Sequence, residues 1–170
     1  MAEPAQTRLW NLVLRYLGYR ARSEKEVRDY LRQKLFKEDF GEEKKELLIT
    51  EIISKLYALN FLDDRTLAER VVSEGRRQYK GKRRILLDLK KKGLATAVIS
   101  SSSNPSSPSE EELASAAAAK RARFYQNLDS QTFRRRLAGY LARRGFEWEV
   151  VKSVVSSAEA LRTDRSELRP

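Results

Sequence analysis

The stretch KRRILLDLKKKGL, residues 82–94, decides the fold of this 170-residue chain. Its apolar residues Ile85 and Leu89 lie four positions apart, the spacing of one face of an α-helix, and lysine and arginine take most of the other positions. Gly93 follows the last lysine, where a glycine commonly ends a helix. The stretch therefore predicts a basic amphipathic helix with one buried stripe.

The same pattern occurs elsewhere in the chain. A shift of 52 positions places Gly93 on Gly145 and Leu89 on Leu141. The basic pairs on both sides of the leucine also align: residues 83–84 with 135–136, and residues 91–92 with 143–144. A fainter copy, shifted by 58 positions, places Leu31 on Leu89. The chain is therefore expected to contain three copies of a unit of roughly 50 residues, and units of this size bury too little surface to be robust unless they stack.

Helical spacing and helix-start signals extend over almost the whole chain, and no segment alternates as a strand. Ser23 with Glu26, and Ser109 with Glu112, have the spacing of capping boxes. We predict an all-α protein of about nine helices, built as three tandem three-helix units in an elongated curved array. The predicted boundaries are residues 7–60, 61–100 and 110–162, with a Ser/Pro-rich linker at residues 101–109.

The basic residues are concentrated in two runs. The chain has 35 Lys and Arg against 24 Asp and Glu, a net charge of +11. Residues 76–92 and 120–144 carry +8 and +7, so the rest of the chain sums to −4. Such runs are either solvated helix faces or binding surfaces for a polyanion or an acidic protein groove. Acids at helical spacing, which would balance a merely solvated face, are nearly absent, and this favours binding. The candidate contact residues are Arg76, Arg77, Tyr79, Lys82, Arg83, Arg84, Lys91, Lys92, Arg134, Arg135, Arg136, Arg143 and Arg144.

Three residues near these runs suggest more specific roles. Tyr79 and Tyr125 lie next to the basic runs, so their rings are candidates for stacking on nucleic-acid bases, with core packing as the alternative. Gly75 interrupts a helical run, which favours close packing of two helices over a hinge.

The composition excludes most catalytic chemistry. The chain has no Cys and no His, which excludes thiol and imidazole nucleophiles, disulfides and ordinary zinc or haem sites. Asp63 and Asp64 form a tight carboxylate pair of the kind that binds Mg²⁺, but they directly precede an apolar run and are better explained as a helix cap. Gly81-Lys82 lacks the other residues of a phosphate loop. We expect no catalytic residue, metal or cofactor, and a soluble cytoplasmic monomer without a membrane segment.

Several motifs in this order resemble the RecX family, the bacterial regulators of the RecA recombinase. The resemblance covers about residues 14–155 and rests on Ser23-x-x-Glu26-Val27, on LDDRTLAER at residues 62–70, on YKGKRRILLDLKKKGL at residues 79–94 and on LARRGFEWEVV at residues 141–151. The insertion at residues 100–119 and a short helix around Val98 depart from the family pattern and make the third unit the least certain to place.

The resemblance implies a modular helical protein that lies in the groove of the RecA filament on single-stranded DNA. Such a protein would lower the ATPase and strand-exchange activities of the filament, favour filament loss and so regulate DNA repair, recombination and the SOS response. Weak, non-specific binding to single-stranded DNA is expected with it. Two alternatives stay open: a stand-alone helical DNA-binding protein that inserts a helix into the major groove, and a metal-dependent enzyme that acts on nucleic acid through Asp63 and Asp64.

Overall fold

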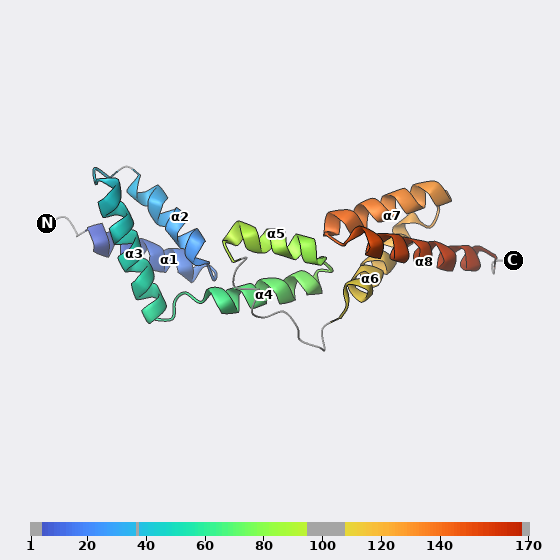
Figure 1. Ribbon diagram of the computed structural model, residues 1–170, viewed down its shortest axis with the longest axis horizontal. Helices are drawn as coiled ribbons and strands as arrows, with labels where there is room; N and C mark the ends of the chain where they lie inside the picture. The colour runs from blue at the N-terminus through green and yellow to red at the C-terminus, as the bar shows by residue number, and fades with distance from the viewer. Residues whose placement is uncertain (1–4, 37, 95–107, 168–170) are drawn as a thin grey trace. The chain divides into compact units, whose positions relative to one another are not determined.

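The computed structural model describes residues 5–36, 38–94 and 108–167, with side chains described as far as Arg162 (Figure 1). These residues form helices and short connections and contain no strand, which confirms the prediction of an all-helical chain. The helices are α1 (Ala5–Gly18), α2 (Glu24–Leu35), α3 (Glu42–Ala58), α4 (Asp64–Arg77), α5 (Lys82–Lys92), α6 (Glu110–Ala122), the 3-10 turn η1 (Arg123–Tyr125), α7 (Ser130–Arg144) and α8 (Trp148–Glu167). The short helix predicted around Val98, and most of the predicted linker, lie outside the described residues. The curved array stays a prediction.

The chain divides into two compact units, which we describe separately. The first contains Met1–Arg70 and Leu89–Ser101, and the second contains Val71–Asp88 and Ser102–Pro170. In the first unit, helices α1, α2 and α3 enclose a core to which each contributes aliphatic side chains one helical turn apart. Its buried members are Leu9, Val13, Val27, Leu31, Leu35, Ile49, Ile52, Ile53, Leu56 and Leu62. The predicted capping box at the start of α2 is confirmed, since the Ser23 hydroxyl accepts from the Glu26 N–H and the Glu26 carboxylate accepts from the Ser23 N–H.

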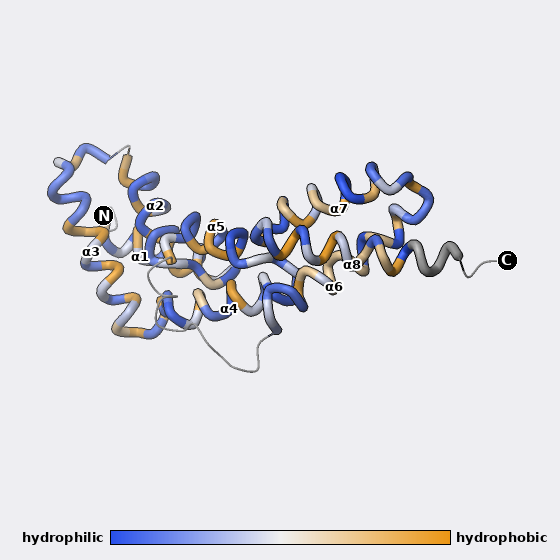
Figure 2. Tube along the Cα trace, turned by 45° about the vertical axis from the view of Figure 1, so that its right-hand side comes forward, coloured by the Kyte–Doolittle hydropathy of each residue, from blue (hydrophilic) through white to orange (hydrophobic). Residues whose placement is uncertain are grey.

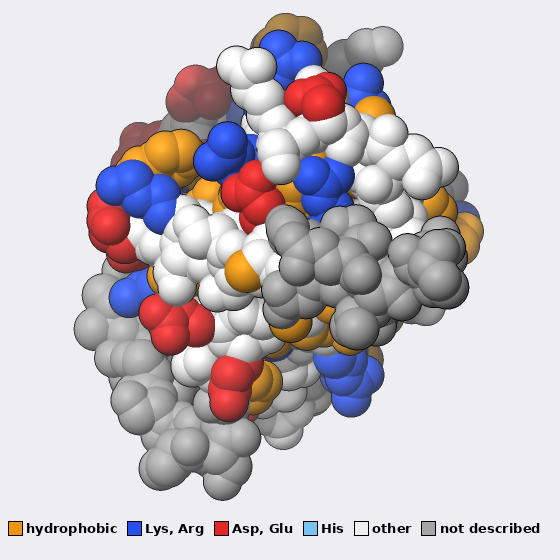
Figure 3. Space-filling view, turned by 90° about the vertical axis from the view of Figure 1, so that its right-hand side faces the viewer, with side chains coloured by type: hydrophobic (Ala, Val, Ile, Leu, Met, Phe, Trp, Pro, Cys, Tyr) orange, Lys and Arg blue, Asp and Glu red, His pale blue; other side chains and the backbone are white. Residues whose placement is uncertain are grey.

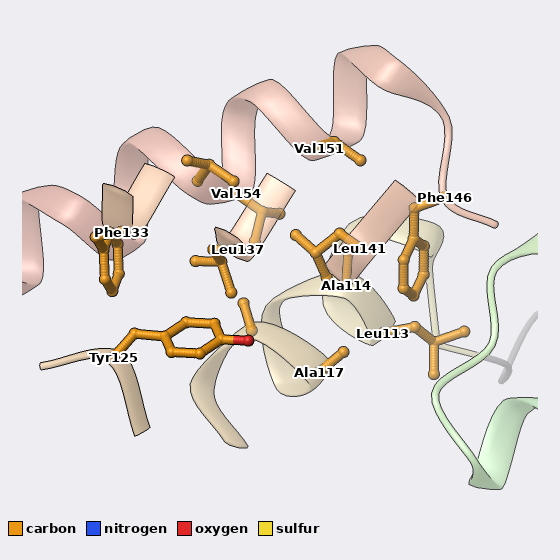
Figure 4. Packing of buried hydrophobic residues seen from close by; sticks show 12 residues of the cluster. Leu113, Ala114, Ala117, Tyr125, Phe133, Leu137, Leu141, Phe146, Val151 and Val154 are labelled. Atoms are coloured by element: carbon orange, nitrogen blue, oxygen red, sulfur yellow. The ribbon is translucent and has the colours of Figure 1, made fainter. Parts of the chain in front are cut away.

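In the second unit, α6, α7 and α8 form a second three-helix core (Figure 4). Small alanines of α6, among them Ala114 and Ala117, face the larger Leu137 and Leu141 of α7, so the two helices approach closely. The predicted capping box of Ser109 and Glu112 begins α6. Gly145 ends α7 in the left-handed conformation, with φ of 86°, which glycine adopts without strain.

Helices α4 and α5 are mostly hydrophilic, and their apolar residues come in short groups such as Val71-Val72 and Ile85-Leu86-Leu87 (Figure 2). Gly75 of α4 lies against Ile85 of α5: a Cβ atom at Gly75 would be 2.7 Å from the Ile85 Cγ1 atom. The prediction that Gly75 marks close helix packing is therefore confirmed. Asp63 is confirmed as the cap of α4, since its carboxylate accepts from the Thr66 N–H at 2.9 Å and from the Thr66 hydroxyl at 2.6 Å.

Candidate functional site

The predicted division of α5 into a buried and a basic face is present in the structure. Ile85 and Leu89 are buried, with 7% and 0% of their surfaces exposed. Lys82, Arg83 and Lys91 point their charges to solvent and make no ion pair among the described residues. Since the apolar residues face the core and these cations are exposed without an ionic partner, the cations are available as a contact surface.

The start of α5 is bonded to the end of α7 through the two backbones. The Gly81 N–H donates to the Arg144 carbonyl at 2.9 Å, and the Arg83 N–H donates to the Gly145 carbonyl at 3.2 Å. The two basic helices therefore meet end to end, the carbonyl end of α7 against the N–H end of α5, an arrangement that the helix dipoles favour.

The remaining N–H groups at the start of α5 are also satisfied. The Glu110 carboxylate at the start of α6 accepts from the Lys82 N–H at 2.5 Å, and the Arg84 N–H donates to the Gly81 carbonyl at 3.0 Å. The N–H groups that an isolated helix would leave unpaired at this end thus have partners. Those of Gly81, Lys82 and Arg83 donate to Arg144, Glu110 and Gly145, and that of Arg84 donates to Gly81.

Helix α7 also carries its cations on an exposed face. Arg135, Arg136 and Arg143 are exposed and make no ion pair within the described part of the chain, while Arg134 lies 3.4 Å from the Glu159 carboxylate. On the face of the molecule in Figure 3, Lys and Arg side chains lie among exposed apolar and acidic ones. The cations on this face are therefore interspersed with other side chains.

Besides Arg134, four of the candidate residues have structural partners instead. Arg84 lies 3.6 Å from Asp88, which also binds Lys80 at 2.8 Å. Lys92 lies 3.4 Å from the Glu26 carboxylate in the first unit. The Arg144 guanidinium donates to the Gln78 carbonyl and lies 5.2 Å from the Tyr140 ring. Arg76 is half-buried and Arg77 is exposed; the buried Nη1 of Arg76 has no hydrogen-bond partner within the described residues. Tyr79 is the fourth residue with a partner.

The Tyr79 ring is half-buried against the α6–α8 core, and the Lys120 ammonium lies 4.4 Å from its centre. One face of that ring is thus taken by a cation. Tyr125 is 8% exposed and belongs to the core, so the suggestion that its ring stacks on a base is wrong. Its neighbour Phe124 is 64% exposed and lies beside the guanidinium of Arg123, at 4.8 Å. Sequence spacing could not separate these two adjacent rings, because the 3-10 turn η1 breaks the helical period there.

In the first unit, the end of α5 meets the start of α2 through side chains. The Glu26 carboxylate accepts from Arg20 at 2.6 Å and lies near Lys92, and Asp64 accepts from the Glu24 N–H at 2.9 Å. Burial alone would raise the pKa of Glu26, but the bonds from Arg20 and the Ser23 N–H, with Lys92 nearby, lower that pKa to about 2. Burial raises the pKa of Asp64, and the carboxylates of Glu24 and Asp63 add to the rise against the bond from the Glu24 N–H.

The described residues offer no group of three or more acidic side chains that could hold a metal ion. Asp63 and Asp64 have separate tasks, one at the start of α4 and one at the start of α2. None of the helices in the described ranges is both long and apolar enough to cross a membrane.

The described residues thus form an all-helical protein with two three-helix cores. The ends of two basic helices, α5 and α7, are in contact within it. The family models of the first and third three-helix domains of RecX match residues 10–43 and 109–155. The "Regulatory protein RecX" of Pelodictyon phaeoclathratiforme is 31% identical over 143 residues, which are 84% of this chain and 83% of that protein. The chain therefore belongs to the RecX family of regulatory proteins.

Two further comparisons agree with this assignment. The "Regulatory protein RecX" of Bacillus velezensis is 29% identical over 161 residues, and this chain spans 58% of its length. The crystal structure of RecX from Lactobacillus salivarius has a TM-score of 0.67 at 27% identity, covering 91% of this chain and 97% of that one. A second crystal structure of a regulatory protein RecX, at 24% identity and a TM-score of 0.64, shows the same fold.

Proposed function

We propose that the chain binds the RecA filament on single-stranded DNA and mainly inhibits its ATPase, strand exchange and growth. In this proposal it acts in the cytoplasm as a monomer, without a cofactor, and so regulates DNA repair and recombination. Membership of a family of regulatory proteins named RecX supports the choice of partner.

The observation that carries the proposal is the end-to-end contact of α5 and α7. It holds Lys82 and Arg83 next to the end of the helix that carries Arg135, Arg136 and Arg143. All five are exposed and none makes an ion pair in the described part of the protein. Two basic helices in fixed contact can bind acidic groups or phosphates spaced farther apart than one helix can reach.

Bridging of this kind explains inhibition. A body bound across neighbouring protomers resists the rearrangements that accompany nucleotide turnover and strand exchange, because its contacts fit one arrangement of the protomers better than another. The cations would interact both with acidic groups of the filament and with the DNA it holds.

The test follows phosphate release and filament length in a mixture of RecA, single-stranded DNA and ATP. The triple change Lys82→Glu, Arg83→Glu and Lys91→Glu should remove most of the inhibition, because three favourable contacts become repulsive. Helicity and melting should stay nearly unchanged, since none of the three residues has an ionic partner. The matching triple Arg135→Glu, Arg136→Glu and Arg143→Glu tests α7.

Exposed cations of the first unit provide the control. Arg15, Lys34 and Lys44 are exposed, and changing all three to Glu alters the net charge by the same amount. This control should inhibit as the original chain does. If both folded test triples inhibit RecA at the original concentrations, the basic faces are merely solvated and the proposed site is wrong.

Direct binding to single-stranded DNA should be weak and strongly dependent on salt. If about five phosphates are neutralised, the plot of log affinity against log salt should have a slope of roughly −3.5, since each phosphate contributes ~0.7. Titration of labelled oligonucleotides at several salt concentrations measures this slope. A flat response, or clear preference for one sequence in the absence of RecA, would instead support a stand-alone DNA-binding protein.

A further inference from the structure

A shallow groove of about 280 Å³ lies between α7 and α8 in the second unit. Helix α7 contributes two arginines and an alanine to it, and the first half of α8 contributes an aromatic ring, two valines and two polar residues. The lining residues are Arg134, Arg135, Ala138, Trp148, Val151, Lys152, Val155 and Ser156. This groove is separate from the contact between α5 and α7.

The floor of the groove is apolar and one wall is an exposed indole. Val151 and Val155 are buried members of the α6–α8 core, and Ala138 packs against that core. Trp148 begins α8 and is 56% exposed. A tryptophan contributes a large contact area with little conformational freedom to lose, and exposed tryptophans beside apolar surface are enriched at binding sites.

The rim of the groove is basic, and no acidic residue lines it. Two of the rim cations are partly balanced from outside the groove, Arg134 by Glu159 at 3.4 Å and Lys152 by Glu149 at 3.7 Å. Arg135 makes no ion pair among the residues described and is exposed. Its positive charge next to an apolar floor is therefore uncompensated.

We propose that this groove binds a short acidic peptide segment that inserts one apolar side chain between Trp148 and the valines. The carboxylates of the segment would pair with Arg135 and Arg134 at the rim. The aliphatic floor favours a branched or aromatic side chain over a nucleobase, because the polar edges of a base would lose water there and find few partners. The inference does not require binding to RecA.

The test uses the whole chain and two labelled ten-residue peptides, each with four aspartates, one with a central phenylalanine and one with serine in its place. Peptide binding is followed by fluorescence anisotropy at ~50 mM salt, and the emission of Trp148 is read in a Trp10→Phe background. The phenylalanine peptide should bind and shift the emission of Trp148, and the serine peptide should bind at least ~10-fold more weakly.

Two variants and one matched control separate the groove from general attraction. Arg135→Glu removes the free rim charge and Ala138→Glu places a carboxylate on the floor, and each should weaken the phenylalanine peptide by ~10-fold or more. Arg136 is exposed on the same helix but does not line the groove, so Arg136→Glu, with the same change in charge, should weaken it by less than ~3-fold.

Four results would overturn the proposal. Equal loss with Arg136→Glu would mean that only net charge matters, and equal binding of the two peptides would mean that the floor is unused. Lack of binding at millimolar peptide would exclude the site. Displacement of the peptide by oligothymidine, together with selective loss of oligothymidine binding in Arg135→Glu and Ala138→Glu, would assign the groove to nucleic acid instead.

Discussion

The two ends of α5 make contacts of opposite kinds, one in each unit of the chain. At its start, in the second unit, the N–H groups of Gly81 and Arg83 bond directly to the carbonyls of Arg144 and Gly145. At its end, in the first unit, Lys92 reaches the Glu26 carboxylate, and Gly93 lies against Lys25. The first contact is made by backbone atoms and the second largely by charged side chains.

The difference shows how a basic chain can join its helices by two means. Direct backbone contact requires both backbone segments to lack a side chain where they approach each other. A Cβ atom at Gly81 would lie 2.5 Å from the Gly145 carbonyl oxygen. Side-chain contact tolerates more shapes, but its strength varies with pH and salt because charges carry it. We therefore expect the two contacts to fail under different conditions.

The largest effect is expected from Gly145→Ala. Alanine at φ of 86° is strained, and its Cβ would collide with the backbone nitrogen of Arg84. Together these should lower the free energy of unfolding by about 2 to 4 kcal/mol. Urea unfolding followed by circular dichroism gives the loss, and hydrogen exchange should show faster exchange of the Gly81 and Arg83 amides.

Two other glycine substitutions separate strain from contact. Gly81 has no positive φ, so Gly81→Ala should disturb the contact without strain and cost less than Gly145→Ala. Gly139 lies within α7, where the nearest atom to a new Cβ is the guanidinium Nη1 of Arg143 at 3.3 Å, and Gly139→Ala should leave stability equal or slightly higher. If Gly145→Ala is as harmless as Gly139→Ala, the backbone contact does not hold α5.

The sequence predicted the local features of these contacts and could not predict their pairing. Gly93 and Gly145 were recognised as helix ends, and Ile85 and Leu89 as a buried stripe, because caps and helical periods are local signals. That Gly145 faces Gly81 depends on packing between residues more than 60 positions apart, and the repeat aligns Gly145 with Gly93 instead.

The same limit applies to the candidate site. Spacing identified the basic runs, and the four-residue spacing of Arg84 and Asp88 also distinguishes Arg84, which lies 3.6 Å from Asp88, from Arg83, which makes no ion pair in the described part of the chain. Spacing could not show that Lys92 pairs with Glu26, since those residues are 66 positions apart. The groove beside Trp148 was missed for a similar reason: an aromatic residue at a helix start gives no periodic signal.

The next largest effect concerns the charged contact and is a dependence on pH. The Glu26 pKa is about 2 in the folded chain against an ordinary value of 4.5, so its carboxylate stabilises the fold above about pH 4.5 and loses this effect as the pH falls toward 2. Glu26→Gln keeps a capping-box side chain but removes the charge. This substitution should lower the free energy of unfolding by about 2 kcal/mol at pH 7 and hardly change it near pH 2.

Urea unfolding of both proteins at several pH values between 7 and 2 measures this convergence. The cost of Gly145→Ala should stay nearly constant over the same range, because the contact that it breaks is formed by backbone atoms. A cost of Glu26→Gln that is the same at pH 7 and pH 3 would show that the Glu26 charge does not stabilise the first unit.

The smallest effect is expected at Asp64 and has the opposite sign. Its pKa is raised by burial and by the carboxylates of Glu24 and Asp63, so its charge costs stability above that pKa, and the cost disappears as the pH falls below it. Asp64→Asn keeps an oxygen that accepts from the Glu24 N–H and should raise the free energy of unfolding at pH 7 by up to ~0.5 kcal/mol, with no gain near pH 3. Asp64→Ala removes the acceptor and should cost about 1 kcal/mol at both pH values. Equal losses from the two variants at pH 7 would mean that the carboxylate charge itself, rather than the acceptor oxygen, holds the start of α2.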